Sequence, residues 1–158
     1  MAMQLKKIVP HLWYDTEAKE AAEFYVSIFP GSKINKITTI HDTPSGDCDI
    51  VRFELSGNPF MAISAGPEFK FNESVSFIVS CDTQDEIDYY TEKLTANGGE
   101  QGPCGWVKDK FGLSWQVDAS ALQQMLENGT EEQKNRVTNA FLKMKKLDLS
   151  AIEKAYKG

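Results

Sequence analysis

The order of elements along this chain repeats once, and that repeat restricts the fold more than any other feature. Each half begins with an apolar strand pattern, followed by an Asp-Thr pair, a helical pattern that ends at glycine, and further strand patterns. The pairs are Asp15-Thr16 and Asp82-Thr83, and aromatic pairs stand at similar places in the two helices, at Phe24-Tyr25 and Tyr89-Tyr90. Such a repeat is typical of a duplicated supersecondary unit. The sequence therefore predicts two β-α-β-β-β modules.

The first module is predicted over residues 6–65, with a helix from 17 to about 29. Asp15-Thr16 is typical of a helix N-cap, and Pro30-Gly31 of a helix end. Runs rich in β-branched and aromatic residues predict four strands, at 8–14, 33–40, 49–55 and 60–64. The polar segment 41–47 is predicted as a loop, and 56–59 as a tight hairpin turn.

The second module is predicted over residues 74–118. Serine alternates with apolar residues over much of 74–81, which is the pattern of a half-buried strand. Thr83 and Glu86 have the spacing of a capping box at the start of the next helix, and Gly98-Gly99 is expected to end that helix.

The segment 102–117 is predicted to form the last hairpin of the second module. Asp109 is expected to open the turn because its carboxylate accepts local backbone N–H bonds, and Gly112 to close it with a positive φ. The segment also holds two of the three tryptophans, a cysteine and two lysines. A simple connector rarely collects such residues, so the hairpin is a candidate for function.

Residues 119–158 are predicted to form a helical tail. Helical patterns cover 120–127, 130–144 and 149–156, and Thr130 with Gln133 forms a capping box. The tail is expected to pack on the sheet or on a second subunit. A chain of 158 residues has the length of one domain with a sizeable core, so residues 1–158 are predicted to form a single domain.

Composition and charge exclude several classes of partner. The net charge is -6 and the pI is about 5.0, so neither nucleic acid nor an anionic membrane is an expected partner. Lys6-Lys7 is followed by only a short apolar run, so no secretory signal is expected. Cys48, Cys81 and Cys104 are odd in number and lack a C-x-x-C spacing, which favours a reducing cytoplasm over a disulfide framework or a zinc site.

Several segments resemble the vicinal-oxygen-chelate superfamily of glyoxalases, bleomycin-resistance proteins and extradiol dioxygenases. Within it they are most similar to the PhnB-like group, often labelled the 3-demethylubiquinone-9 3-methyltransferase domain. The matching residues are Leu12-Trp13, Phe24-Tyr25, Ile28-Phe29-Pro30, the segment 69–73 and, most specifically, 102–117. The resemblance implies an α+β, glyoxalase/bleomycin-resistance-like fold, in which two βαβββ modules form a half-open cup, here with C-terminal helices added. It also implies a homodimer.

The metal enzymes of this superfamily place their ligands on the first and last strands of each module, and the resemblance transfers those positions to this chain. They fall at Ile8, Met61, Ser74 or Ser76, and Gln116. Divalent cations prefer carboxylates, imidazoles or thiolates, so these side chains do not make a metal site. The chain is therefore predicted to bind no metal, and no cofactor is predicted.

A pocket for a small molecule is predicted on the inner face of the cup. Small polar side chains there would lie among large apolar ones, as in sites that bind small organic molecules. The residues expected to contact the ligand are Phe53, Met61, Ser74, Ser76, Trp106, Lys108, Ser114 and Gln116. The amide of Gln116 needs a hydrogen-bond partner, which would be either the ligand or another part of the protein.

Three further side chains are candidate catalytic groups. His11 lies one residue out of phase with Ile8 and Leu12, so it is expected to face away from the pocket, whereas His41 lies in a loop that could cover it. Cys104 is either a nucleophile whose thiolate is favoured by Lys108 or a buried structural thiol.

Three classes of function are left open by the sequence. The leading hypothesis is a cytoplasmic homodimer that binds a small molecule in the cup without metal. One alternative is an enzyme, either the methyltransferase of the family label or a metal-dependent glyoxalase or dioxygenase-type lyase. The methyltransferase lacks support from a G-x-G-x-G loop after a strand. The other alternative is a non-catalytic dimeric interaction module.

Overall fold

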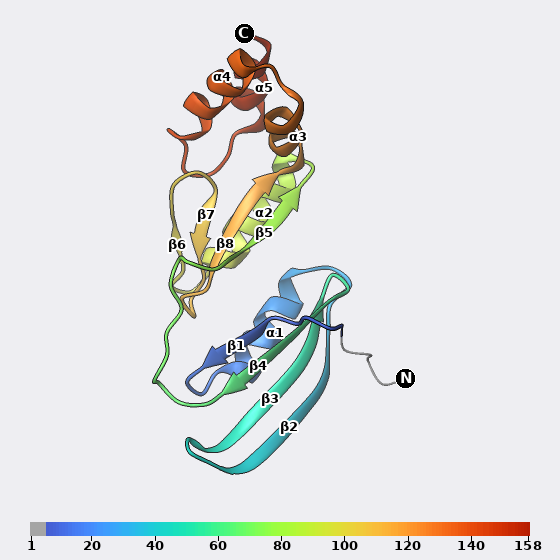
Figure 1. Cartoon of the computed structure of the whole chain (residues 1–158), viewed down its shortest axis with the longest axis vertical. Coiled ribbons are helices and arrows are strands. Elements are labelled where there is room, and N and C mark those ends of the chain that lie inside the picture. The colour runs from blue at the N-terminus through green and yellow to red at the C-terminus, as the bar shows by residue number, and fades with distance from the viewer. Residues whose placement is uncertain (1–5) are drawn as a thin grey trace. The chain divides into compact units, whose positions relative to one another are not determined.

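The computed structural model describes residues 6–158. The chain divides into two compact units, Met1–Phe71 and Asn72–Gly158, and each contains one four-stranded sheet (Figure 1). The modules predicted at 6–65 and 74–118 fall one in each unit. Residues 1–5, which belong to the stretch in which no secretory signal is expected, lie outside the described residues.

The first unit has the order strand, helix and three strands. Its elements are β1 (His11–Tyr14), α1 (Ala18–Ile28), β2 (Lys33–Thr43), β3 (Gly46–Leu55) and β4 (Asn58–Ser64). The order in the sheet is β1-β4-β3-β2, with β1 parallel to β4 and the other neighbours antiparallel. The tight turn predicted at 56–59 is confirmed, because Ser56 and Gly57 both have a positive φ between β3 and β4.

The first half of the second unit repeats this arrangement. Its elements are β5 (Ser76–Cys81), α2 (Gln84–Thr95), β6 (Glu100–Gln101), β7 (Trp106–Lys108) and β8 (Ser114–Ala119). The order in the sheet is β5-β8-β7-β6, again with the first and last strands of the module parallel and the others antiparallel. The duplicated β-α-β-β-β module predicted from the sequence is therefore confirmed.

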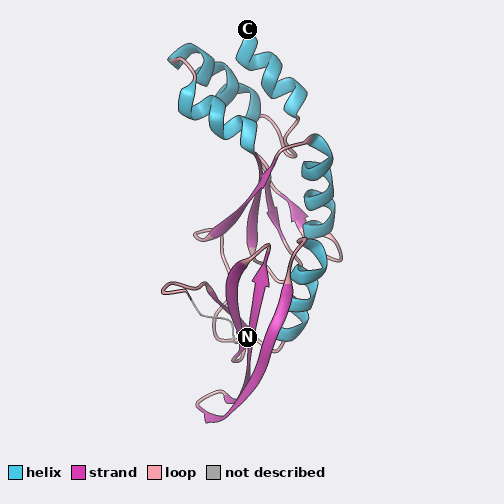
Figure 2. Cartoon of the chain, turned by 90° about the vertical axis from the view of Figure 1, so that its right-hand side faces the viewer, coloured by secondary structure: helices cyan, strands magenta, loops and turns pink. Residues whose placement is uncertain are grey.

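One helix covers one face of each sheet, and the core of each unit lies between the two (Figure 2). In the first unit, Val51, Phe53 and Leu55 alternate along β3 with less buried residues and form part of that core. In the second unit, Val107 and Val117 are buried in the same way. Strand alternation turns the intervening side chains to the face of each sheet that is not covered by its helix. We call this uncovered face the outer face; it is the face on which the ligand pocket was predicted.

The start of the first module differs from the sequence-based prediction. The first strand begins at His11 rather than at Ile8, whose side chain is 87% exposed. The predicted N-cap at Asp15-Thr16 is wrong, because α1 begins after Glu17. The backbone N–H of Ala18 instead donates to the hydroxyl of Ser64, at 3.0 Å. A side chain from β4 therefore satisfies the helix start, which local sequence does not reveal.

Two predicted segments are shorter or displaced. The loop predicted at 41–47 is mostly strand, because β2 continues to Thr43 and β3 begins at Gly46. At the start of the second module, the prediction that Ser74 lies in a strand is wrong. Ser74 is exposed in a turn, where its backbone N–H and its hydroxyl both donate to Oδ1 of Asn72.

The two predicted capping boxes are confirmed, whereas the helix end predicted at Gly98-Gly99 is wrong, because α2 ends at Thr95 with Ala96 as its C-cap. The hydroxyl of Thr83 accepts from the N–H of Glu86, whose carboxylate in return accepts from the N–H of Asp82. Thr130 and Gln133 form the complete reciprocal capping box.

The tail forms three helices, α3 (Ser120–Asn128), α4 (Glu131–Phe141) and α5 (Leu149–Lys157), which gather at one end of the second unit (Figure 1). The side-chain amide of Gln84 on α2 donates to the carbonyl of Leu147 at 3.0 Å and accepts from the N–H of Leu149 at 2.9 Å. Lys146 adds an ion pair to Asp88. These contacts attach the tail to α2, so the tail packs within its own unit.

Among residues 6–158, no helix has both the length and the apolar character that a membrane span requires.

Candidate functional site

The hairpin of β7 and β8 is organised by one buried carboxylate. Asp109 is only 2% exposed, and its Oδ1 accepts from the backbone N–H groups of Phe111 and Leu113. Its Oδ2 accepts from the indole nitrogen of Trp115 at 2.9 Å. Gly112 has the predicted positive φ, of 89°. The predicted hairpin is therefore confirmed, and its turn is fixed by interactions with both carboxylate oxygens.

Polar side chains share the outer face of the second sheet, as alternation predicted. Ser76 on β5 lies beside Ser114 on β8, and Ser114 lies opposite Lys108 on β7. Trp106 lies opposite Gln116 in the same way. Paired residues of neighbouring strands point to the same face, so these five side chains form two adjacent rows on it, Ser76–Ser114–Lys108 and Gln116–Trp106.

A pocket of about 350 Å³ lies at the β6–β7 edge of this sheet. The residues that line it come from β6, the loop after β6, β7, the start of β8 and the segment before β5. They are Glu73, Glu100, Gln101, Gly102, Pro103, Trp106, Val107, Lys108 and Ser114. A volume of this size falls at the lower end of the range of small-molecule sites.

Ser114 is the most distinctive polar group of the pocket. The residue is only 1% exposed, and its hydroxyl makes no hydrogen bond within residues 6–158. No side-chain nitrogen or oxygen in that range is both fully buried and unpaired, so the hydroxyl oxygen itself stays accessible from the pocket. A hydroxyl without a protein partner needs water or a ligand as its partner, because leaving it unpaired costs free energy. A hydroxyl that lines a pocket and lacks a protein partner is suited to bind a group that enters the pocket.

Lys108 is the cation of the pocket lining, and it is paired with a carboxylate. Its Nζ lies 2.6 Å from Oε1 of Glu73. This hydrogen bond lowers the pKa of Glu73 and raises the pKa of Lys108 from their ordinary values. Glu100, which lies opposite Lys108 in the β6–β7 pair, also raises the pKa of Lys108 by its charge. Both members of the pair are therefore ionised at neutral pH.

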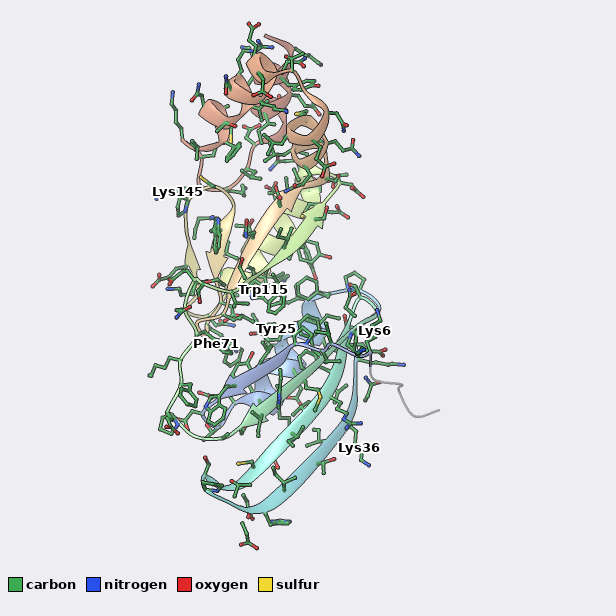
Figure 3. All side chains as sticks on the ribbon, viewed as in Figure 1. Lys6, Tyr25, Lys36, Phe71, Trp115 and Lys145 are labelled. Carbon is green, nitrogen blue, oxygen red and sulfur yellow. The ribbon has the colours of Figure 1, made fainter. Side chains whose placement is uncertain are left out.

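The loop between β6 and β7 is held by the C-terminal segment. The N–H groups of Cys104 and Gly105 donate to the carbonyls of Met144 and Lys145, at 2.8 and 2.7 Å. Figure 3 labels Lys145 near this loop. Gly105 has a φ of 81°, and a Cβ there would lie 2.6 Å from the carbonyl oxygen of Val117, so only glycine fits. The loop that carries Pro103 into the pocket is therefore well anchored.

The structure brings together only part of the predicted ligand-binding set. Trp106, Lys108 and Ser114 line the pocket. Gln116 lies on the same face but donates from its amide nitrogen to the hydroxyl of Ser76 at 2.9 Å, so each finds a partner in the protein. Ser74 lies outside the sheet, in the exposed turn described above.

Two predicted residues belong to the first unit and lie on opposite faces of its sheet. Phe53 is 0% exposed and stacks on Phe60 in the core, whereas Met61 lies beside His11 on the outer face. The expectation that Phe53 and Met61 share the face of one pocket is therefore wrong. His11 was expected to face away from the pocket, but it lies on the same face as Met61, a residue expected to line it. The error came from starting the strand alternation at Ile8, which lies outside the strand.

Glu73, Glu100, Gln101 and Pro103 were missed as pocket residues. Glu73 ends the segment 69–73, which had been noted only for its resemblance. Glu100 lies opposite Lys108 in the β6–β7 pair. A strand predicted at 100–101 and paired with the strand of Lys108 would have placed Glu100 beside that lysine. Gln101 donates from its side-chain amide to the carbonyls of Gly102 and Trp106. This contact depends on the folded loop, so sequence patterns do not reveal it.

The candidate catalytic residues are placed as follows. His41 lies on β2 with its Nδ1 2.9 Å from a carboxylate oxygen of Asp47, and both side chains are exposed. Cys104 is partly buried in the 102–105 loop, and the Lys108 side chain that was considered as its partner is paired with Glu73. Within the described part of the chain, no three His, Cys, Asp or Glu residues gather closely enough to hold a metal ion.

Comparison with known proteins identifies relatives of the fold. The family model described as 3-demethylubiquinone-9 3-methyltransferase matches residues 6–118. The solved PhnB protein from Bacillus cereus is 30% identical, with a TM-score of 0.63 over 73% of this chain and 100% of that chain. No curated protein matches significantly.

More distant structures share the fold alone. A protein from Pseudomonas aeruginosa is 21% identical, with a TM-score of 0.59 over 73% of this chain and 98% of its own. The fosfomycin resistance protein FosX from Listeria monocytogenes is 17% identical, with a TM-score of 0.56 over 80% of this chain and 98% of its own. These likenesses confirm the predicted α+β fold of the glyoxalase/bleomycin-resistance type.

Proposed function

This chain belongs to the 3-demethylubiquinone-9 3-methyltransferase (PhnB-like) family of the vicinal-oxygen-chelate superfamily, and from that premise we propose that it binds a small organic molecule in the pocket at the β6–β7 edge. The observation that carries the proposal is the hydroxyl of Ser114, a nearly buried residue, which is accessible from the pocket and has no protein partner within residues 6–158. Trp106 and Pro103 supply apolar surface beside it, and Lys108 and Glu73 supply charge. A mostly apolar pocket with a few polar anchors is the usual form of a small-molecule site.

We propose that this binding involves neither a metal ion nor methyl transfer. The side chains at the transferred metal positions are an alkyl chain, a thioether, a hydroxyl and an amide. The chain also lacks a glycine-rich loop after a strand to hold the adenosyl cofactor of a methyltransferase. Calorimetry with S-adenosylmethionine separates the alternatives: saturable micromolar binding would favour the methyltransferase, and heats equal to dilution would favour the present proposal.

Fragment binding followed by NMR tests the pocket itself. A set of neutral aromatic fragments, each with one hydrogen-bonding group, should shift the backbone amide signals of Trp106, Lys108 and Ser114. Ser114→Ala should weaken the hydrogen-bonding fragments about threefold to tenfold, since a hydrogen bond contributes roughly 1 kcal/mol. Ser80→Ala is the matched control, because Ser80 is an exposed serine of β5 that does not line the pocket. Shifts confined to other parts of the protein would contradict the proposal.

We also propose that residues 1–158 act as one domain, in a cytoplasmic homodimer. The free state of all three cysteines is what a reducing compartment would give, and the resemblance to this superfamily supports the dimer. Light scattering at micromolar concentration measures the assembly directly. A mass that stays at 17.7 kDa up to 100-fold higher concentration would contradict the dimer.

A further inference from the structure

Resting on the proposed function, we propose that the ligand of this pocket is an organic cation: an amine, positively charged at neutral pH, attached to a compact apolar or aromatic body. Three features of the pocket lead to this class. They are the balance of its charges, the aromatic ring in its wall and the position of its free hydroxyl.

The charges that line the pocket sum to an excess of one negative charge. Glu73 and Glu100 contribute carboxylates, and Lys108 contributes the ammonium group. The ammonium is already in contact with Glu73, at 2.6 Å. Glu100 has neither a hydrogen bond to its side chain nor a contact ion pair within residues 6–158. The charge that is available to a ligand is therefore negative.

An anionic ligand would meet an unfavourable arrangement in this pocket. To reach the ammonium of Lys108, it would have to displace Glu73 and leave that carboxylate beside Glu100 without its cation. Like charges at such a site repel each other, and the lost ion pair adds to the cost. An ammonium ligand instead approaches Glu100 and leaves the Lys108–Glu73 pair intact.

The remaining lining residues suit the body of such a ligand. Trp106 lies on the same strand as Lys108 and lines the pocket with its large apolar side chain, while Pro103 lines the loop side. Indole is the aromatic ring that interacts most favourably with a cation. The hydroxyl of Ser114, free of protein partners, is available to a hydrogen-bonding group on the ligand. A charged amine on a compact body uses all three features.

A matched pair of probes tests the sign of the charge. Phenethylamine is a cation at pH 7 and 3-phenylpropionate is an anion, and both present a phenyl ring on a short chain. We expect phenethylamine to bind the wild-type protein at least about threefold more tightly, as measured by NMR titration of the Trp106 and Lys108 amides. Part of the preference should disappear in 0.5 M salt, because the carboxylates are at least partly exposed and such charges are screened.

Substitution of Glu100 tests whether this carboxylate causes the preference for the cationic probe. Glu100→Gln should weaken phenethylamine about threefold to fivefold and leave 3-phenylpropionate unchanged or slightly tighter. Glu92→Gln on α2 is the matched control, because it removes an exposed carboxylate that does not line the pocket. If the two substitutions had equal effects, the preference for the cation would come from the net negative charge of the protein, and the proposal would be overturned.

Failure of this inference is distinguishable from failure of the proposed function. Equal binding of the two probes at the pocket, or tighter binding of the anion, would overturn the cationic ligand while supporting a small-molecule site. If neither probe binds in the pocket, the cationic class is also overturned. The proposed function is then decided independently by the binding of neutral fragments to the wild-type protein and to Ser114→Ala.

Discussion

The carboxylate of Asp109 accepts a hydrogen bond from the indole nitrogen of Trp115, 2.9 Å away, across the turn that joins β7 to β8. Both residues are buried, and the same carboxylate also accepts from the N–H groups of Phe111 and Leu113. One side chain therefore closes the turn and positions a large ring of β8 in the core. Because Lys108 and Ser114 flank this turn, the geometry of the pocket depends on it.

Replacement of Asp109 by asparagine should destabilise the protein. The amide oxygen can still accept from the backbone, but the amide nitrogen is a donor and faces the donor of Trp115, which is left unpaired. Leaving one buried donor unsatisfied costs roughly 1–3 kcal/mol, and Asp109→Asn is expected to lower the free energy of unfolding by that amount. Urea denaturation followed by tryptophan fluorescence measures this. The matched control is Glu153→Gln, an exposed acid-to-amide change on α5, and equal stability of the two variants would contradict the assigned role of Asp109.

Replacement of Gln84 by alanine should loosen the helical tail. The amide of Gln84 pairs with the carbonyl of Leu147 and the N–H of Leu149, and both groups lose a partner in Gln84→Ala. A loss of about 1–3 kcal/mol in unfolding free energy is expected from these hydrogen bonds. Hydrogen exchange should also be faster at Leu149 and in the segment 144–149. Gln124→Ala on α3 is the control, because that glutamine is exposed, and similar exchange rates in both variants would argue against the tail contact.

The ion pair of Glu73 and Lys108 predicts a defined pH response. The hydrogen bond to Lys108 lowers the pKa of Glu73 below its ordinary 4.5, so the stabilisation from this group is present above pH 4.5 and is lost as the pH falls through the lowered pKa. The same bond raises the pKa of Lys108 above 10.5, so its contribution is present below pH 10.5 and is lost as the pH rises through the raised pKa.

NMR titration of the Glu73 carboxyl carbon checks this response. We expect a midpoint below 4.5 in the wild-type protein and a higher midpoint in Lys108→Gln. Lys93→Gln is a control that removes an exposed lysine of α2. An unchanged Glu73 midpoint in Lys108→Gln would show that the pair does not form in solution.

The three cysteines should differ sharply in reactivity. Burial raises the pKa of Cys81 to about 12, and Cys48 is also buried, whereas Cys104 is partly exposed. Only the thiolate reacts with a disulfide reagent, and only where the reagent can reach it. The native protein should therefore show one accessible thiol at pH 8, absent in Cys104→Ser, and three after denaturation. Rapid reaction of a second thiol in the native protein would contradict the packing around Cys48 or Cys81.

The protein is expected to retain no divalent metal after purification without chelator or affinity-tag metal. The side chains of Ile8 and Met61 offer nothing to a hard cation, and Gln116 contributes a neutral amide whose nitrogen is bonded to Ser76. Elemental analysis by mass spectrometry measures the metal content. About one equivalent of zinc, manganese, nickel or iron per chain, lost in Gln116→Ala, would restore the metalloenzyme alternative.

The repeated fold was accessible from the sequence because its signals are local. The alternation along β3, the Thr83 and Thr130 caps, and the turn of Asp109 and Gly112 each depend on residues a few positions apart, and the structure confirms these signals. The start of α1 was not accessible, because Ser64, which accepts from its first N–H, lies 46 residues away in the chain.

The sequence predicted the site residues of the β7–β8 pair but not those of other elements. The faces of Trp106, Lys108 and Ser114 followed from alternation around a well-defined turn. In the first unit, alternation counted from Ile8 gave the wrong face for His11, because an irregular segment precedes β1. Glu73 approaches Lys108 from the segment before β5, and no local pattern links two residues so far apart in sequence.

The bonds from Cys104 and Gly105 to Met144 and Lys145 determine how far this protein can be shortened. A chain cut after residue 119 would keep both sheets but would lose the acceptors for two N–H groups beside the pocket. It would also lose Leu147, whose side chain packs close to Gly105. The bond between Gln84 and Leu149 extends the requirement by a few more residues. The minimal chain that preserves the pocket therefore includes the segment from α4 to α5, so the tail is part of the structure that forms the pocket.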